Sequence, residues 1–257
     1  MNESCIDSSG QSVCEQVRFL YTELAQRPDQ DFGWGKGRDN AHTLGYDPAW
    51  LRRLPEQVWE SAAAVGNPFA LGPIRPDETI VDFGCGAGAD TCIAALIVGS
   101  SGRVIGVDLT PAMVEKARAN AELLGLVNVT IYEADMGETS LPEASADVII
   151  SNGSINLSPS KACVLKEALR VLKPAGRLYI ADMVRDPAVG DHPTLPEPDA
   201  EQTSALWAHC VAGTLAPACF MQMLVEAGFV DAEFVATTGY RTAPETVGAL
   251  FRARKPA

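Results

Sequence analysis

Short apolar runs alternate with amphipathic stretches through the middle of the chain. Apolar runs of four or five residues are typical of buried strands, and apolar residues three or four positions apart are typical of helices. The pattern predicts strands at 80–83, 104–107, 129–133, 147–151 and 177–180, and helices at 90–98, 111–124 and 161–171. Such alternation predicts right-handed crossovers and an α/β fold with a doubly wound, mostly parallel sheet.

Other segments are expected to surround this core. Residues 1–30 carry a short helical pattern, residues 31–48 are rich in glycine and aromatic side chains and predict an ordered loop, and residues 49–65 predict a helix. Residues 185–202 are rich in proline and aspartate, which predicts an excursion from the core. A helix at 217–228 and a strand at 229–237 are expected to follow.

We therefore expect three parts in the chain. They are an N-terminal helical and aromatic cover (1–70), a Rossmann-like core (71–184), and an insertion with a C-terminal part that completes the sheet (185–257). With 257 residues and 47% hydrophobic content, the chain is long enough to bury one good core beneath such a cover. Whether loop 31–48 acts as a lid or only covers the sheet stays open here, with the cover favoured.

Composition narrows the classes of partner. The net charge is −13, from 33 acidic against 20 basic residues, which argues against binding to nucleic acid or to anionic membranes. No apolar stretch approaches the roughly 18 residues of a membrane span, and the first residues lack the pattern of an export signal. The seven cysteines are scattered without a CxxC pair, which favours reduced thiols over a disulfide framework or a metal site. We expect a cytoplasmic protein, monomeric or homodimeric.

A glycine-rich turn follows the first predicted strand. Gly84, Gly86 and Gly88 stand in a G-x-G-x-G pattern, and glycine lets the backbone pass close to a ligand where a Cβ would collide. Asp108 lies 20 residues beyond Gly88, at the tip of the next predicted strand. An acidic residue at this place typically accepts hydrogen bonds from ribose hydroxyls. The sequence therefore predicts a ribose-containing cofactor at the edge of a parallel sheet.

Acidic residues around the turn indicate which cofactor this is. In nicotinamide enzymes the third glycine normally comes three residues after the second, whereas here the spacing is two. Asp82 adds a carboxylate that would repel a pyrophosphate but suits a cationic amino-acid group. Asp135 follows the third strand, where it could accept the adenine amino group, and Ser151 and Asn152 end the fourth strand at the same edge.

Together these residues resemble the class I S-adenosylmethionine-dependent methyltransferases. The resemblance covers roughly residues 75–182 and includes LKPAGRLYIAD near the fifth strand. It implies the Rossmann-like fold of that class, with S-adenosyl-L-methionine as cofactor and Asp82 holding its methionine amino group. The cofactor contacts that it implies are Asp82, Gly84, Gly86, Gly88, Asp108, Leu109, Asp135, Met136 and Ser151.

Four further segments are similar to the arsenite methyltransferase family. They are GNPFALGPI (66–74), GVDLTPAMVEKAR (106–118), SNGSINLSPSK (151–161) and CVAGTL (210–215). In that family trivalent arsenic is held by three cysteine thiolates, and soft thiolates suit such a centre. Here the first two positions are Val65 and Gly153, and only Cys210 matches. The resemblance thus implies the family's methyl transfer but not its thiol chelation, unless Cys85, Cys163 or Cys219 substitutes.

Candidates for the acceptor side follow from the same segments. Methyl transfer needs mainly alignment and exclusion of water, and a hydroxyl or amine acceptor can also need a base. His209 precedes Cys210 and is the best candidate for that base, with a surface histidine as the ordinary alternative. Asn152 could orient an acceptor or cap the strand, and Tyr21 could lie near the cofactor or pack in the core.

Our interpretation is a methyltransferase that acts on a small-molecule acceptor, with no nucleic-acid or membrane partner. The alternatives are a genuine arsenite methyltransferase that uses Cys210 with another thiol, a nicotinamide-dependent oxidoreductase, and a non-catalytic module that binds S-adenosyl compounds as a regulator. The glycine spacing counts against the oxidoreductase, and the intact SNGSINLSP string counts against a decayed enzyme.

Overall fold

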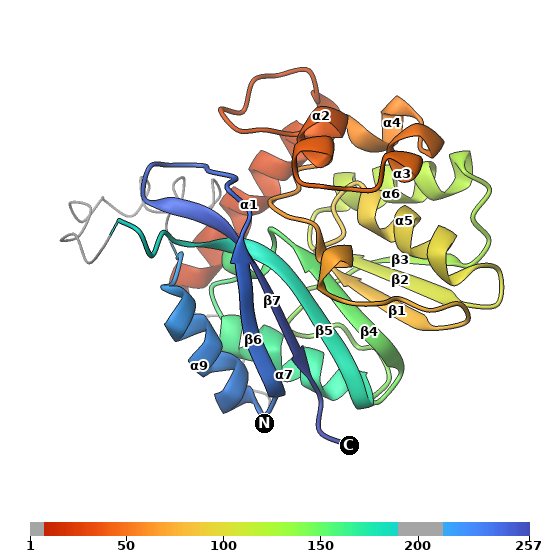
Figure 1. The fold of residues 1–257 in the computed structure, drawn as a ribbon. Coiled ribbons are helices and arrows are strands. Elements are labelled where there is room, and N and C mark those ends of the chain that lie inside the picture. Colours follow the sequence, from red (N-terminus) through yellow and green to blue (C-terminus); the bar gives the residue numbers. More distant parts are fainter. Residues whose placement is uncertain (1–7, 190–212) are drawn as a thin grey trace.

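A seven-stranded sheet forms the centre of the computed structural model, which describes residues 8–189 and 213–257 (Figure 1). The strand order is β3-β2-β1-β4-β5-β7-β6. The strands are β1 (Thr79–Phe83), β2 (Arg103–Asp108), β3 (Val129–Glu133), β4 (Ala146–Asn152), β5 (Leu172–Arg185), β6 (Val230–Thr237) and β7 (Thr246–Arg254). The first five pair in parallel, and β7 pairs antiparallel with both β5 and β6. The predicted doubly wound, mostly parallel sheet is therefore confirmed.

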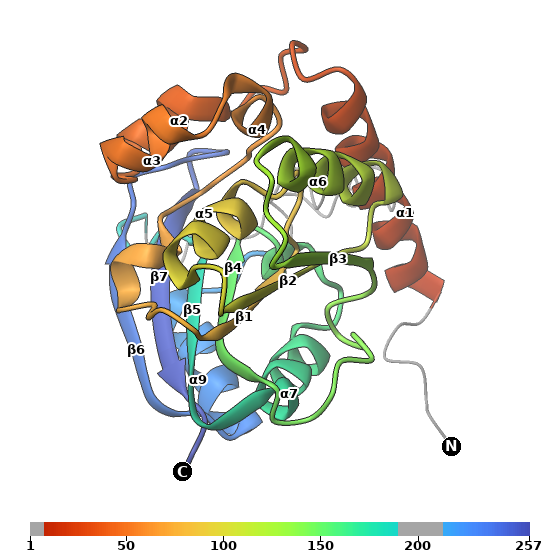
Figure 2. The ribbon, with the colours of Figure 1, turned by 90° about the vertical axis from the view of Figure 1, so that its right-hand side faces the viewer.

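Helices cover both faces of this sheet, as Figure 2 shows from the side. On one face α5 (Ala89–Val98) and α6 (Pro111–Leu123) pack, and on the other lie α7 (Lys161–Val171) and α9 (Pro217–Ala227). Alternate residues of β1 serve the two faces, because side chains alternate along a strand. Ile80 packs with Val98 of α5, whereas Val81 packs in the cluster that contains Leu165 of α7.

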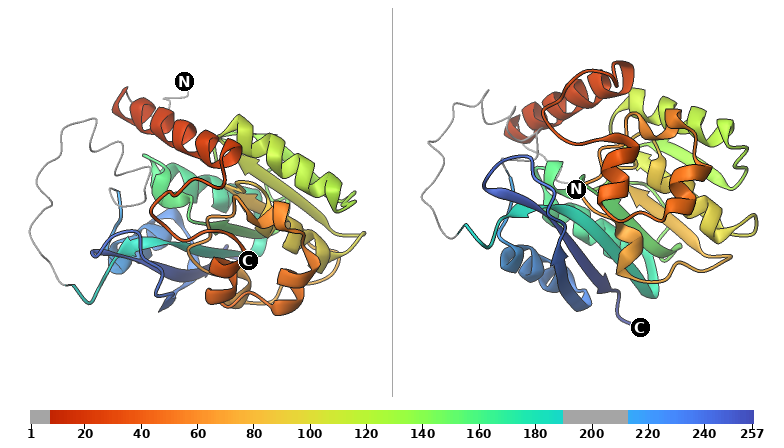
Figure 3. Two further views of the ribbon diagram at one scale, coloured as in Figure 1. Left: turned by 90° about the horizontal axis from the view of Figure 1, so that it is seen from above. Right: turned by 45° about the horizontal axis from the view of Figure 1, so that its top comes forward.

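Four helices precede the sheet and lie along one end of it, in red and orange in Figure 3. They are α1 (Ser8–Gln26), α2 (Gly37–Thr43), α3 (Pro48–Arg53) and α4 (Glu56–Trp59), followed by the 3-10 turn η1 (Pro68–Leu71). The predicted loop 31–48 is therefore wrong over α2. The predicted helix 49–65 is two short helices, because Pro55 forces Leu54 into an extended conformation (φ −85°, ψ 131°).

The C-terminal half differs from prediction in one strand. Strand β7 was not predicted, although it lies between β5 and β6 and is buried over most of its length. The predicted 177–180 strand extends to the 14 residues of β5, because β7 pairs with it from Arg177 to Arg185. The predicted excursion at 185–202 falls largely outside the described residues.

Within the described residues, no helix is long and apolar enough to cross a membrane. The same segments hold no cluster of three histidine, cysteine or acidic side chains arranged to bind a metal ion.

Candidate functional site

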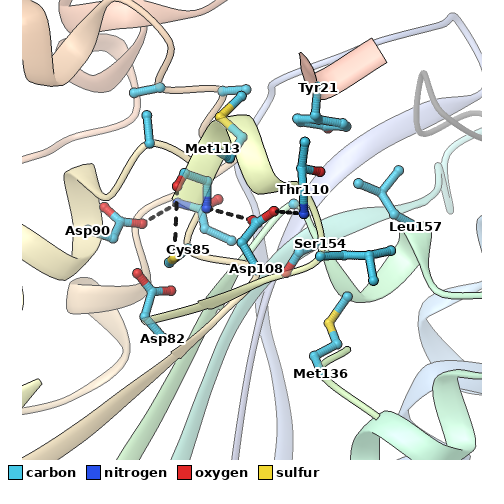
Figure 4. A pocket seen from close by; sticks show the side chains of 18 of the residues that line it. Tyr21, Asp82, Cys85, Asp90, Asp108, Thr110, Met113, Met136, Ser154 and Leu157 are labelled. Atoms are coloured by element: carbon cyan, nitrogen blue, oxygen red, sulfur yellow. Dashed lines mark hydrogen bonds between the residues drawn. The ribbon is translucent and has the colours of Figure 1, made fainter. Parts of the chain in front are cut away.

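A cavity opens at the carboxyl ends of the central strands (Figure 4). Its position is the one expected for a ligand in an open α/β sheet, since β1 lies between β2 and β4 and the strand order reverses there. Its walls come from α1, Tyr46, residues 59–64, Asp82 of β1, and the carboxyl ends of β1, β2, β3 and β4 with the segments that follow them.

The glycine turn between β1 and α5 forms the floor of this cavity. Gly84 has a φ of +70°, and a Cβ on it would lie 2.2 Å from the Cβ of Ser154. Gly86 has a φ of +52° and nothing within 4 Å of the position of its Cβ, so its backbone faces open space. A ligand can therefore approach the main chain at Gly86, and this is the property that a cofactor cradle requires.

Gly88 allows close packing between two helices rather than lining the cavity. It is the N-cap residue of α5 with a φ of +85°, and a Cβ there would lie 3.1 Å from the Cβ of Ala117 on α6. Gly88 is absent from the cavity lining and brings α5 close to α6. The structure thus places two of the three predicted glycines in the site and the third behind it.

Asp108 at the tip of β2 fixes the conformation of this turn. One carboxylate oxygen accepts a hydrogen bond of 2.8 Å from the Gly86 N–H, and the other accepts one of 2.8 Å from the Thr110 N–H. Burial raises the pKa of Asp108, while these N–H donors oppose the rise. The Asp108 carboxylate also lines the cavity, at the strand tip where the sequence predicts a ribose contact.

Two further carboxylates, Asp82 and Asp90, lie at one end of the cavity (Figure 4). Asp82 is 2% exposed, and its carboxylate accepts a 2.6 Å hydrogen bond from the Thr91 hydroxyl. Burial, followed by the charge of Asp90, raises the pKa of Asp82 to about 8. Burial also raises the pKa of Asp90 to about 6, against hydrogen bonds from Asn152 and Tyr46. A cationic group entering here would favour the ionised form of both.

Asn152 at the tip of β4 joins three segments of the chain. Its side-chain oxygen accepts a hydrogen bond of 3.0 Å from the Val65 N–H. Its amide nitrogen lies 2.9 Å from the Tyr46 hydroxyl, from the Gly66 carbonyl and from an Asp90 oxygen, and the Tyr46 hydroxyl donates to the other Asp90 oxygen at 2.8 Å. With its polar atoms engaged in this way, Asn152 is suited to position Asp90 rather than to orient an acceptor.

The raised pKa values of Asp82 and Asp90 predict how the empty protein responds to pH. A carboxyl group whose pKa rises on folding stabilises the fold fully below its unfolded pKa, and that stabilisation is lost as the pH rises toward the folded value. We expect the melting temperature of the ligand-free protein to fall by several degrees between about pH 5 and pH 8. Asp82→Asn, measured by differential scanning fluorimetry across that range, should flatten the fall; an unchanged slope would contradict the assignment.

The other predicted residues divide into three groups. Tyr21, Leu109, Asp135 and Met136 line the cavity. Ser151 does not line it, since its hydroxyl is buried behind the turn and donates to the Phe83 carbonyl at 3.0 Å. His209 and Cys210 lie outside the described residues.

Asp90, Tyr46 and Trp59 are among the lining residues that were not predicted to form part of the site. Asp90 lies two residues after Gly88, the last glycine of the turn, and this short distance is a signal from which it could have been predicted. Tyr46 and Trp59 belong to segments interpreted as a cover, yet both side chains reach the cavity. Their rings pack edge to face with centroids 6.1 Å apart. The cover therefore forms part of the wall of the site.

The two positions that lack thiols lie against each other. A Cβ on Gly153 would lie 3.2 Å from a methyl carbon of Val65, whose side chain is 3% exposed. Of the cysteines weighed as substitutes, Cys85 and Cys219 are free, whereas Cys163 is disulfide-bonded, so the expectation of reduced thiols is wrong at that position. Burial raises the pKa of the Cys85 thiol well above its ordinary value.

This sheet topology, with a glycine turn and acidic strand tips around one cavity, is the class I methyltransferase fold. A family model described as a methyltransferase domain matches residues 74–228. The chain belongs to that methyltransferase domain family.

The relatives agree with this assignment. The chain is 38% identical over 191 residues to an arsenite methyltransferase of Halobacterium salinarum, which is 74% of this chain and 46% of the relative. It is 36% identical over 199 residues to that of Aquipseudomonas alcaligenes, covering 73% and 55%. The chain thus spans about half the length of the curated relatives it matches.

Solved structures show the same fold. An arsenic(III) S-adenosylmethionine methyltransferase from Chlamydomonas reinhardtii superposes with a TM-score of 0.57 at 27% identity, over 87% of this chain and 74% of that chain. A geranyl diphosphate methyltransferase, solved with geranyl diphosphate and sinefungin, superposes with a TM-score of 0.63 at 20% identity, over 95% and 99%.

Proposed function

We propose that this protein transfers a methyl group from S-adenosyl-L-methionine to a small organic acceptor that is not held by thiolates. Its family membership and its arsenite methyltransferase relatives support methyl transfer. The observation that carries the choice of acceptor is the contact between Val65 and Gly153, because a buried isopropyl group fills the place where the resemblance requires two sulfur atoms.

The described residues fit the proposed cofactor. The open main chain at Gly86 leaves room beside the turn, and the Asp108 carboxylate lines the cavity where the ribose hydroxyls would lie. Asp82 and Asp90 supply negative charge where the amino group would lie, and Asp135 and Met136 would border the adenine. Gly88 and Ser151 would support this arrangement from behind.

When bound, the cofactor supplies a sulfonium methyl group that is already activated toward a nucleophile. The protein would then mainly align the two molecules and exclude water, as in-line transfer requires. Tyr21 on α1 and Trp59 before β1 enclose the cavity and serve that exclusion. We keep His209 and Cys210 as predicted acceptor-side residues, and a cytoplasmic location and a monomeric or homodimeric state as predictions.

The test of the acceptor assignment restores the missing thiols. Val65→Cys combined with Gly153→Cys places two thiols within reach of one arsenic atom, so we expect arsenite affinity to rise at least about 100-fold over the natural protein. Isothermal titration with arsenite measures this. Val65→Ala with Gly153→Ala is the matched control, because it changes the same Cβ positions without adding sulfur.

Three outcomes separate the alternatives. Rapid methylation of arsenite by the natural protein would favour a genuine arsenite methyltransferase over our proposal. Tight binding of S-adenosylhomocysteine without methyl release across a broad panel of organic acceptors would favour the regulatory module. Absence of S-adenosylhomocysteine binding would contradict both the enzyme and the module.

A further inference from the structure

We propose that the methyl acceptor is an uncharged organic molecule with an apolar face, and that phosphorylated and other anionic acceptors are excluded. This inference rests on the proposed methyl transfer and names the class of its acceptor. It draws on three features of the described lining: an apolar wall, polar groups that are already paired, and the sign of the charges.

The apolar wall lies opposite the acidic end of the cavity. Figure 4 shows Tyr21 and Leu157 on the side away from Asp82 and Asp90. Val17 and Leu157 line this side, and each is 8% exposed. They pack in one cluster with Val65, so the isopropyl group at the missing-thiol position lies behind this wall and supports it. Removing apolar surface of an acceptor from water is favourable at such a wall.

The hydroxyl and amide groups beside this wall are engaged within the protein. The Ser154 hydroxyl lies 2.7 Å from the Phe83 carbonyl and 2.7 Å from the Ser151 hydroxyl. The Asn152 amide nitrogen donates to Asp90 and to the Tyr46 hydroxyl. A charged acceptor would lose its hydration here without gaining comparable donors, and that desolvation is costly.

The charged residues of the cavity also argue against an anionic acceptor. Asp82, Asp90, Asp108 and Asp135 are assigned above to the cofactor, and among the other lining residues that the structure describes there is no lysine, arginine or histidine to pair with an anionic acceptor. Phosphate groups are held in proteins by such cations or by arrays of N–H donors.

A matched pair of probes tests this inference. The probes are 2-naphthol and 2-naphthyl phosphate, which share one carbon skeleton, titrated calorimetrically into the protein saturated with S-adenosylhomocysteine. We expect the phenol to bind at least about 10-fold more tightly than the phosphate. Equal or tighter binding of the phosphate overturns the inference, and so does the failure of both probes to bind.

Adding a positive charge on α1 tests the expected preference for an uncharged acceptor. Val17→Lys adds a cation to the apolar wall and should reduce the preference for the phenol at least about 5-fold. Phe19→Lys is the control, because Phe19 lies two residues further along the same helix and is 66% exposed. Unchanged preference in a folded Val17→Lys protein overturns the inference; if that variant does not fold, the wild-type comparison still decides. Loss of S-adenosylhomocysteine binding by the natural protein would contradict the proposed function instead.

Discussion

Replacement of Gly84 by alanine is expected to lower the melting temperature of the protein by about 10 °C. The new Cβ would lie 2.2 Å from the Cβ of Ser154 and 2.4 Å from its hydroxyl oxygen. Ser154 cannot move aside cheaply, because it is 6% exposed and its hydroxyl is hydrogen-bonded to Phe83 and Ser151. Overpacking of this kind costs about 1–3 kcal/mol, and a left-handed φ of an alanine adds about 1 kcal/mol.

Gly86→Ala is the matched comparison for this prediction. Nothing lies within 4 Å of the position of its Cβ, so only the left-handed φ opposes the substitution and the melting temperature should fall by about 3 °C. Its backbone faces the cavity, however, so S-adenosylhomocysteine affinity should fall at least about 10-fold. Scanning fluorimetry and calorimetric titration give the two readouts. Similar stability losses in the two variants would show that the turn does not divide the roles in this way.

Replacement of Asp108 by alanine is expected to weaken S-adenosylhomocysteine binding at least about 100-fold. The carboxylate holds the Gly86 and Thr110 N–H groups at 2.8 Å, and we propose that it also accepts from the ribose hydroxyls. Hydrogen bonds to charged groups contribute about 1.5–3 kcal/mol each, so the loss of a ribose contact and of the ordered turn exceeds a factor of 100. Calorimetric titration measures the effect.

Two controls locate this effect. Asp108→Asn keeps an acceptor for one N–H and should bind more tightly than the alanine variant but less tightly than the natural protein. Asp39→Ala removes an exposed aspartate on α2, outside the cavity lining, and should leave affinity within about 2-fold. A ligand affinity that stays near the natural value in Asp108→Ala would exclude Asp108 from the cofactor site.

Local pattern was sufficient for much of the core. Strands such as β1 and β3 could be predicted because short apolar runs such as Ile80–Phe83 are typical of buried strands and are bounded by turn residues. Helix α6 could be bounded because Pro111 favours a first helical turn. Strand β7 escaped prediction because its place between β5 and β6 is a matter of pairing with residues far apart in the sequence.

The residues of the site likewise fall into those that the sequence could predict and those that it could not. Gly84, Gly86 and Asp108 could be found because the turn and the acid at the strand tip recur at fixed spacing in ribose-binding folds. Tyr46 and Trp59 could not, because their segments precede the sheet and carry no spacing that relates them to the cavity. Ser151 was predicted to contact the cofactor from its place at the end of β4, yet its hydroxyl is buried behind the turn.

The sequence by itself determined the class of fold and the strand tips that meet at one edge, because residue periodicity and glycine spacing are local properties of a chain. It also showed that Val65 and Gly153 stand where the related family places thiols. Only the tertiary structure decided that these two residues touch, that Asn152 is engaged with Asp90 and Tyr46, and that Gly88 lies behind the site. Those facts depend on how segments distant in sequence pack together, and packing is settled by the shape and burial of the whole molecule.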